Sequence, residues 1–120
     1  MSKTLFKDRN LMGLIGDEDT VTGLLLTGMG DIDAKQRANF LVVDKKTEVD
    51  DIKAKFTELT KSRNDIGIVL INQWVADLIR SEVDAYKAIF PTILEIPSKD
   101  HPYDPSKDSV IKTIQKMFDD

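Results

Sequence analysis

The acidic residues Asp17, Glu18 and Asp19 are the densest group of side chains that could do chemistry. They follow an apolar run at residues 11–15, where a strand is expected to end and a helix to begin. Three carboxylates there could hold a magnesium ion, which prefers oxygen ligands. Alternatively, Asp17 or Asp19 caps the helix and the other acids favour its dipole, which contributes about 1 kcal/mol. We interpret the group as a helix cap.

Glycines lie near these acids, but they do not form a phosphate-binding loop. Gly13 and Gly16 lack the spacing of the dinucleotide motif G-x-G-x-x-G. Gly23 and Gly28 have the P-loop spacing, but the letters MG follow where that motif requires Lys and Ser or Thr. The neighbouring carboxylates would also repel a phosphate at the helix N-terminus. Nucleotide binding is therefore not supported, and no cofactor is expected.

His101 is the only histidine and lies in the segment SKDHPYD. With Asp100 and Asp104 nearby, it could be a metal ligand or a general base. The chain has no cysteine and no second histidine to complete a metal site, and Ser98 has no convincing base and orienting group. We interpret this segment as a stiff surface connector. Its residues of interest are Pro97, His101, Pro102 and Pro105.

The composition is that of one soluble globular domain. The chain has 120 residues, of which 41% are hydrophobic and 32% charged, and its formal net charge is -4. An acidic balance without a basic stripe argues against nucleic acid as a partner. The first ten residues lack the features of a signal peptide, and no apolar run approaches the roughly 18 residues of a membrane span. We expect a cytosolic protein without direct membrane insertion.

The elements that must position these residues alternate between strands and helices. Apolar runs predict strands at residues 11–15, 40–43, 66–71 and 92–96. Three of these runs are nearly continuous, which is typical of strands buried on both faces of a parallel sheet. Four β-α pairs predict an α/β fold with a small doubly wound, flavodoxin-like or receiver-like sheet of strand order 2-1-3-4.

Apolar spacing predicts a helix after each of the first three strands. The first has its stripe at Val21, Leu24, Leu25 and Met29 and ends at Gly28 or Gly30. The second is expected to begin at Thr47, in a capping-box-like segment TEVD. The third has a single stripe at Val75, Leu78, Ile79, Val83 and Tyr86, and Pro91 prevents its continuation.

A receiver-like fold raises the alternative of a free-standing signalling domain with an acidic magnesium pocket. Such a domain needs a phosphoaccepting aspartate at the end of the third strand and a lysine after a fifth strand. The third strand instead ends in Asn72 and Gln73, and no fifth strand is evident. The alternative is therefore the weaker interpretation.

The chain closes with a strongly amphipathic segment. Asp104 and Pro105 predict its start, as N-cap and first helical residue. The spacing of the apolar residues in this segment fits a helix that packs against another protein's helices. It fits equally a last helix that covers the domain's own sheet. We divide the chain into an α/β domain at residues 1–97 and a connector with C-terminal helix at residues 98–120. The apolar stripe of that helix is Val110, Ile111, Ile114, Met117 and Phe118.

Four segments resemble a known family. GDEDTVTGLLLTGMG, NFLVV, DIGIVLINQ and LEIPSKDHPYDPSKDSV are together similar to the F subunits of the eukaryotic V-type proton-pumping ATPase. The similarity runs from about residue 11 to residue 118. Its most specific part is the segment at residues 94–110, which no general α/β pattern requires.

This resemblance implies a non-catalytic component of the central rotor. The C-terminal helix would then leave the domain and pack on the coiled coil of the D subunit of that pump, helping to couple ATP hydrolysis to proton transport. The resemblance also implies other central-stalk subunits as neighbours, only indirect contact with the catalytic hexamer, and a peripheral place on the cytosolic face of acidic organelles. It favours the outward-reaching interpretation of the stripe.

Overall fold

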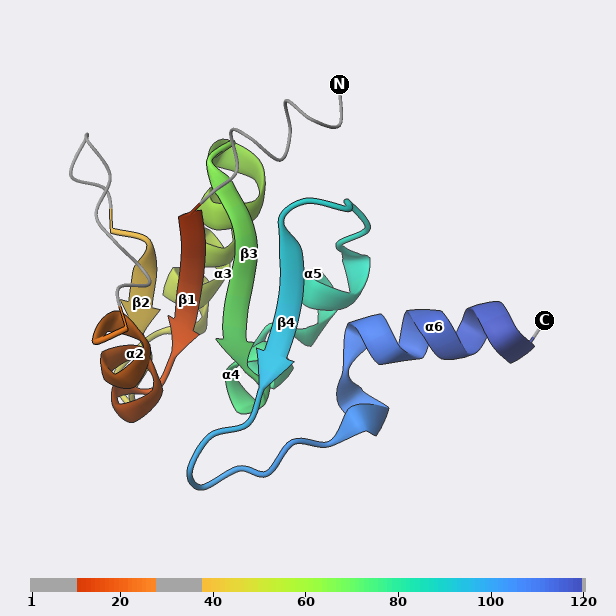
Figure 1. Cartoon of the computed structure of the whole chain (residues 1–120). Coiled ribbons are helices and arrows are strands. Elements are labelled where there is room, and N and C mark those ends of the chain that lie inside the picture. Colours follow the sequence, from red (N-terminus) through yellow and green to blue (C-terminus); the bar gives the residue numbers. More distant parts are fainter. Residues whose placement is uncertain (1–10, 28–37, 120) are drawn as a thin grey trace.

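Four parallel strands form a sheet in the order β2-β1-β3-β4 (Figure 1). The structure is a computed structural model that describes residues 11–27 and 38–119. The strands are β1 (Leu11–Gly16), β2 (Phe40–Val42), β3 (Ile66–Asn72) and β4 (Thr92–Ile96). All three neighbouring pairs are parallel. The predicted α/β fold, strand positions and strand order are confirmed.

Helices cover the two faces of the sheet unequally. Behind the sheet in Figure 1 lie α3 (Val49–Thr57), α4 (Gln73–Leu78) and α5 (Arg80–Ala85). A π-helical turn, η1 (Glu58–Ser62), extends α3. The helix α2 (Glu18–Leu25) connects β1 to β2, whereas the later connections, from β2 to β3 and from β3 to β4, cross the sheet in the opposite direction. Because crossovers are right-handed, α2 lies on the other face of the sheet.

The main core lies between the sheet and the three helices behind it. Val69 and Ile71 of β3 and Ile93 of β4 point into it and are buried. Alternate residues of these strands point to the other face. There Ile68 and Leu70 are only partly buried, and Leu94 is 42% exposed. The described helices therefore fill one side of β3 and β4 more completely than the other.

Two of the predicted helix patterns are wrong in detail. Thr47 does not cap α3: its hydroxyl accepts from the Asp44 N–H at 3.0 Å, and Glu48 takes the N-cap position without a side-chain bond. The predicted third helix is broken at Ile79, whose φ of -126° and ψ of 36° separate α4 from α5. The break leaves Leu78 exposed, although Val75, Ile79 and Val83 are buried. The predicted helix end at Gly28 or Gly30, and the stripe residue Met29, lie outside the described residues.

The last helix begins later than predicted. Asp104 accepts from Ser106 N–H and caps only a short 3-10 turn, η2 (Pro105–Lys107). The helix α6 (Ser109–Asp119) follows, and the carboxylate of Asp108 accepts from Val110 N–H at 2.9 Å at its start. In Figure 1, α6 runs outward beyond β4 instead of lying across the sheet.

Candidate functional site

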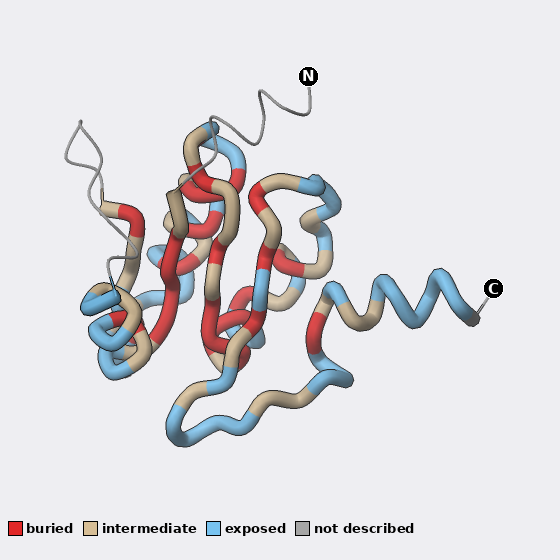
Figure 2. Tube along the Cα trace, viewed as in Figure 1, coloured by how far each residue is buried: buried red, intermediate tan, exposed pale blue. Residues whose placement is uncertain are grey.

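The apolar stripe of α6 is exposed along most of its length (Figure 2). Val110 and Ile114 are 41% and 43% exposed, and Met117 and Phe118 reach 74% and 85%. Ile111 is partly buried. A row of large apolar side chains in water is the feature that marks a protein–protein interface. The stripe is therefore the leading candidate for a functional surface.

An arginine–glutamate pair lies beneath the first turn of α6. The two guanidinium ends of Arg80 donate to the two carboxylate oxygens of Glu95, at 2.8 and 3.0 Å. The side chain of Glu95 is only 2% exposed. Burial lowers the pKa of Arg80, but bonds to Glu95 and Asp77 outweigh it and hold the pKa above its usual value. Charge-assisted bidentate pairs of this kind have a fixed geometry.

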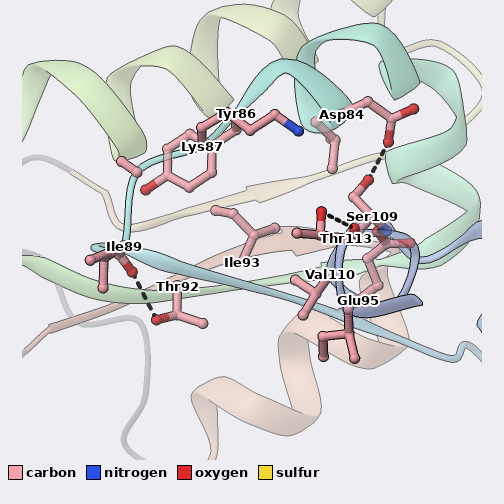
Figure 3. A pocket seen from close by; sticks show the side chains of 13 residues that line it. Asp84, Tyr86, Lys87, Ile89, Thr92, Ile93, Glu95, Ser109, Val110 and Thr113 are labelled. Atoms are coloured by element: carbon pink, nitrogen blue, oxygen red, sulfur yellow. Dashed lines mark hydrogen bonds between the residues drawn. The ribbon is translucent and has the colours of Figure 1, made fainter. Parts of the chain in front are cut away.

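Ser109, the first residue of α6, is bound to that pair. Its backbone N–H donates to Glu95 at 3.1 Å, and its hydroxyl accepts from Arg80 at 3.1 Å. The same hydroxyl donates to Asp84 of α5 (Figure 3). This bond lowers the pKa of Asp84 against the opposing effect of burial, and Lys112 lies 3.6 Å from the same carboxylate. The first turn of α6 is thereby fixed to α5 and β4.

Asp108 links the same turn to the connector. Its carboxylate is mostly buried, caps α6, and accepts from the hydroxyl of Tyr103 at 2.5 Å. This hydrogen bond, assisted by burial, raises the pKa of Tyr103 to about 12. The junction formed by Arg80, Glu95, Asp84, Ser109, Asp108 and Tyr103 is called the α6 junction below.

Two amides at the carboxyl end of β3 hold the connector. Gln73 accepts from the backbone N–H of Asp104 at 2.6 Å and donates to the carbonyl of the same residue at 2.7 Å. Asn72 donates to the carbonyl of Pro97 at 3.2 Å and accepts from Asp17 N–H at 2.8 Å. A Cβ on Gly16 would clash with the Asn72 oxygen, so a glycine is needed beside it. The position where a receiver needs its phosphoacceptor thus holds an amide with structural bonds.

The connector residues lie at the surface. Pro97, Pro102 and Pro105 are exposed, as is His101. The His101 ring stacks on Trp74, with ring centroids 5.5 Å apart, and its Nδ1 lies 3.2 Å from the Ser98 hydroxyl. The backbones of residues 98 and 101 also bond to each other in both directions. The serine–histidine contact therefore belongs to a closed surface turn, and it gives no support for a nucleophile.

The acidic residues that follow β1 act as predicted for a helix cap. Asp17 is the N-cap of α2, and its carboxylate accepts from Thr20 N–H at 2.8 Å. Glu18 and Asp19 lie in the exposed first turn. Within residues 11–27 and 38–119, no cluster of three acidic, histidine or cysteine side chains could hold a metal ion. Within the same ranges, no helix has the length and apolar character to cross a membrane.

Sequence reasoning found the α6 stripe but missed the α6 junction. Arg80 lies within a segment predicted as helix, and Glu95 lies within the apolar run TILEI, so neither pattern indicated that the two side chains meet. One signal was present, because a glutamate at a core-facing position of a buried strand requires a cationic partner. The identity of that partner, which lies on a separate helix, could not be read from the sequence.

Comparisons with known proteins point to one family. The family model "ATP synthase (F/14-kDa) subunit" matches residues 12–114. A protein of Neurospora crassa, named as the F subunit of the V-type proton ATPase, is 57% identical over 114 residues, covering 93% of this chain and 92% of its own. The Saccharomyces cerevisiae protein of that name is 54% identical, covering 92% and 95%. The Homo sapiens protein is 48% identical, covering 90% of each chain.

Proposed function

Because the chain belongs to the family of V-type proton ATPase F subunits, we propose that it is a non-catalytic part of the pump's central rotor. Its α6 binds the coiled coil of the D subunit, and its α/β domain rides on the rotating stalk. ATP hydrolysis and proton movement belong to other subunits, and this chain helps to couple them. The observation that carries the proposal is the exposed stripe of α6.

The spacing of the stripe supports a coiled coil as its partner. Val110, Ile114 and Met117 follow each other at intervals of four and three residues, which is the spacing that interlocks with another helix. Met117 and Phe118, at the far end, are mostly exposed and are not part of the domain's own core. Burying such side chains contributes about 1.5–3 kcal/mol each before the costs of ordering.

The α6 junction supports a role in force transmission. A helix attached to its domain by a flexible tether would transmit torque poorly. Here Glu95, Ser109 and Arg80 are bonded together at the base of the helix, so its direction is set by the domain. The prolines of the connector further restrict the chain between β4 and α6.

We place the protein on the cytosolic face of acidic-organelle membranes, held there through its partners. Other stalk subunits near the membrane sector are its expected neighbours, and it contacts the catalytic hexamer indirectly. The exposed carboxylates Glu18 and Asp19 face solvent or those neighbours.

Substitution at the far end of the stripe tests the proposal. A Met117→Asp/Phe118→Asp variant and the wild-type chain are titrated with purified D subunit, and complex formation is measured by size-exclusion chromatography with mass detection. We expect a loss of at least a hundredfold in affinity, because two apolar side chains become charged at the contact. The matched control is Leu26→Asp, since Leu26 is 84% exposed but lies at the end of α2.

Equal binding by the double variant and the wild type would overturn the proposed contact. Circular dichroism of both variants separates a binding defect from unfolding. The same titration with Ile114→Asp, closer to the base of α6, is expected to weaken binding as well.

A further inference from the structure

We propose that the partner's helix occupies a corner with two walls, one formed by α6 and the other by the loop between α5 and β4. The inference rests on the proposed function, and extends its surface from one helix to the α/β domain. The carrying residue on the second wall is Ile89, which is 79% exposed. The partner is a helix with an apolar stripe that has acidic residues along one border.

A hollow separates the two walls. It has a volume of about 220 Å³, and Val110 and Ile114 line it from the side of α6. Tyr86 and Ile89 of the loop between α5 and β4 also line it, as does Ile93 of β4. Figure 3 shows Ile89 and Thr92 toward one end of this space, Val110 toward the other, and Ile93 between them.

The size of the hollow indicates what fills it. Small-molecule pockets usually measure about 300–1,000 Å³, so this space is small for a ligand. Its open side is continuous with the exposed stripe, because Val110 and Ile114 belong to both. A helix that lies along the stripe must therefore pass over the hollow. One large apolar side chain of that helix can enter it, as knobs enter holes between packed helices.

Lysines along one border of the corner define the charge of the partner. Lys87, Lys112 and Lys116 line one depression beside α6, together with a single acid, Asp84. This is a local reversal in a chain whose formal net charge is -4. Interface charges are usually complementary, so the partner's helix should carry glutamates or aspartates beside its apolar stripe on that side.

The second wall has a mechanical consequence. A helix that contacts only α6 could roll about the α6 axis under load. A contact with Ile89 blocks that rotation, since the loop that carries it belongs to the α/β domain and lies away from the axis of α6 (Figure 1). Two contacts at an interface that carries torque keep the partner's helix from rotating relative to this chain.

Site-specific cross-linking tests the corner directly. The chain contains no cysteine, so each introduced cysteine is its only thiol. We would label Ile89→Cys, Phe118→Cys and Leu26→Cys variants with a photoactivatable maleimide, mix each with purified D subunit, irradiate, and locate adducts by mass spectrometry. We expect adducts on one helical stretch of the partner from positions 89 and 118, and none from position 26.

The outcomes separate this inference from the proposed function. Adducts from position 118 without adducts from position 89 would overturn the two-walled corner and leave the proposed function standing. No adducts from either position, with the mixture shown to form a complex, would overturn both. Adducts from position 89 alone would overturn the two-walled corner and the proposed α6 contact, and would leave only a contact with the α/β domain.

Affinity measurements give a second, independent test. Ile89→Asp should weaken binding to the D subunit by roughly tenfold or more, because an interface anchor becomes charged. Lys87→Gln/Lys116→Gln should reduce the dependence of affinity on salt, because exposed charge pairs are screened. Unchanged affinity for Ile89→Asp, with Leu26→Asp as the matched control, would contradict the second wall.

Discussion

The first turn of α6 and its last two turns are formed by opposite kinds of contact. At the base, Ser109 lies among hydrogen bonds to Arg80, Glu95 and Asp84, and most of these groups are buried or half-buried. At the far end, Met117 and Phe118 are 74% and 85% exposed. The polar groups at the base are hydrogen-bonded to other residues of the domain, whereas the apolar side chains at the end are not buried by any residue in the described part of the chain.

The two ends of α6 therefore differ in what stabilises them. The base orients the helix relative to the sheet, and its bonds contribute to the folding of the domain. The end exposes an apolar surface, which under the proposed function a partner subunit buries. Substitutions at the base should therefore change stability, and substitutions at the end should change binding alone.

The largest effect on stability is expected from Arg80→Ala. It leaves the Glu95 carboxylate buried without its bidentate partner, which costs about 3 kcal/mol of unfolding free energy. Urea denaturation followed by circular dichroism measures the loss. An Arg80→Ala/Glu95→Gln variant should recover part of it, since the uncompensated charge is gone. A loss below about 1 kcal/mol would show that the base does not depend on this pair.

A smaller effect is expected from Gln73→Leu. The change removes both bonds to the Asp104 backbone but leaves a side chain of similar size. We expect a loss of about 2 kcal/mol, because backbone groups of the connector lose their partners and can regain water only in part. Hydrogen exchange at the amide of residue 104 should accelerate with it. Unchanged exchange would mean that the connector is held by other contacts.

The bond between Tyr103 and Asp108 should make the base sensitive to alkaline pH. The pKa of Tyr103 is raised from 10.0 to about 12 by its bond to Asp108. The contribution of this bond is therefore complete below pH 10 in the folded protein, and is lost as pH rises through about 12. Unfolding free energies measured from about pH 9 to about pH 12 should fall less in Tyr103→Phe than in the wild type. Parallel curves would contradict the assignment.

The smallest effect on stability is expected at the far end. Phe118→Asp alone should change the unfolding free energy by less than about 0.5 kcal/mol, because the ring contributes little to the domain's own packing. Chemical denaturation of the free chain measures this value. A loss of about 1 kcal/mol or more would mean that the stripe packs against its own domain in solution, which would erase the contrast between the two ends.

Much of the fold was predictable because it depends on local patterns. The apolar runs around Leu14, Val69 and Ile93 predicted strands, and their alternation with helices predicted a parallel sheet, for which the flavodoxin-like order was expected. The cap at Asp17 was predictable for the same reason, since its carboxylate bonds to a backbone group three residues away. The stripe of α6 was also readable, because periodicity alone defines a helix face.

Predictions failed where a particular contact overrides a general preference. Thr47 has the residue type of a helix cap, but its hydroxyl bonds to Asp44 instead. The pattern around Ile79 suggests one helix, whereas the chain breaks there, next to the arginine that binds β4. Asp104 caps only a 3-10 turn, while the buried Asp108 takes the cap of α6.

The sequence by itself determined the positions of the strands and the apolar face of α6, since both follow from the spacing of residue types along the chain; the strand order was expected from the flavodoxin-like fold. Only the tertiary structure decided where that face points. The direction of α6 depends on Arg80, Glu95 and Ser109, which are far apart in the sequence and meet only after β4 has paired with β3. Hydrogen bonds and ion pairs act over a few ångströms, so their partners are fixed by the folded chain and not by residue order.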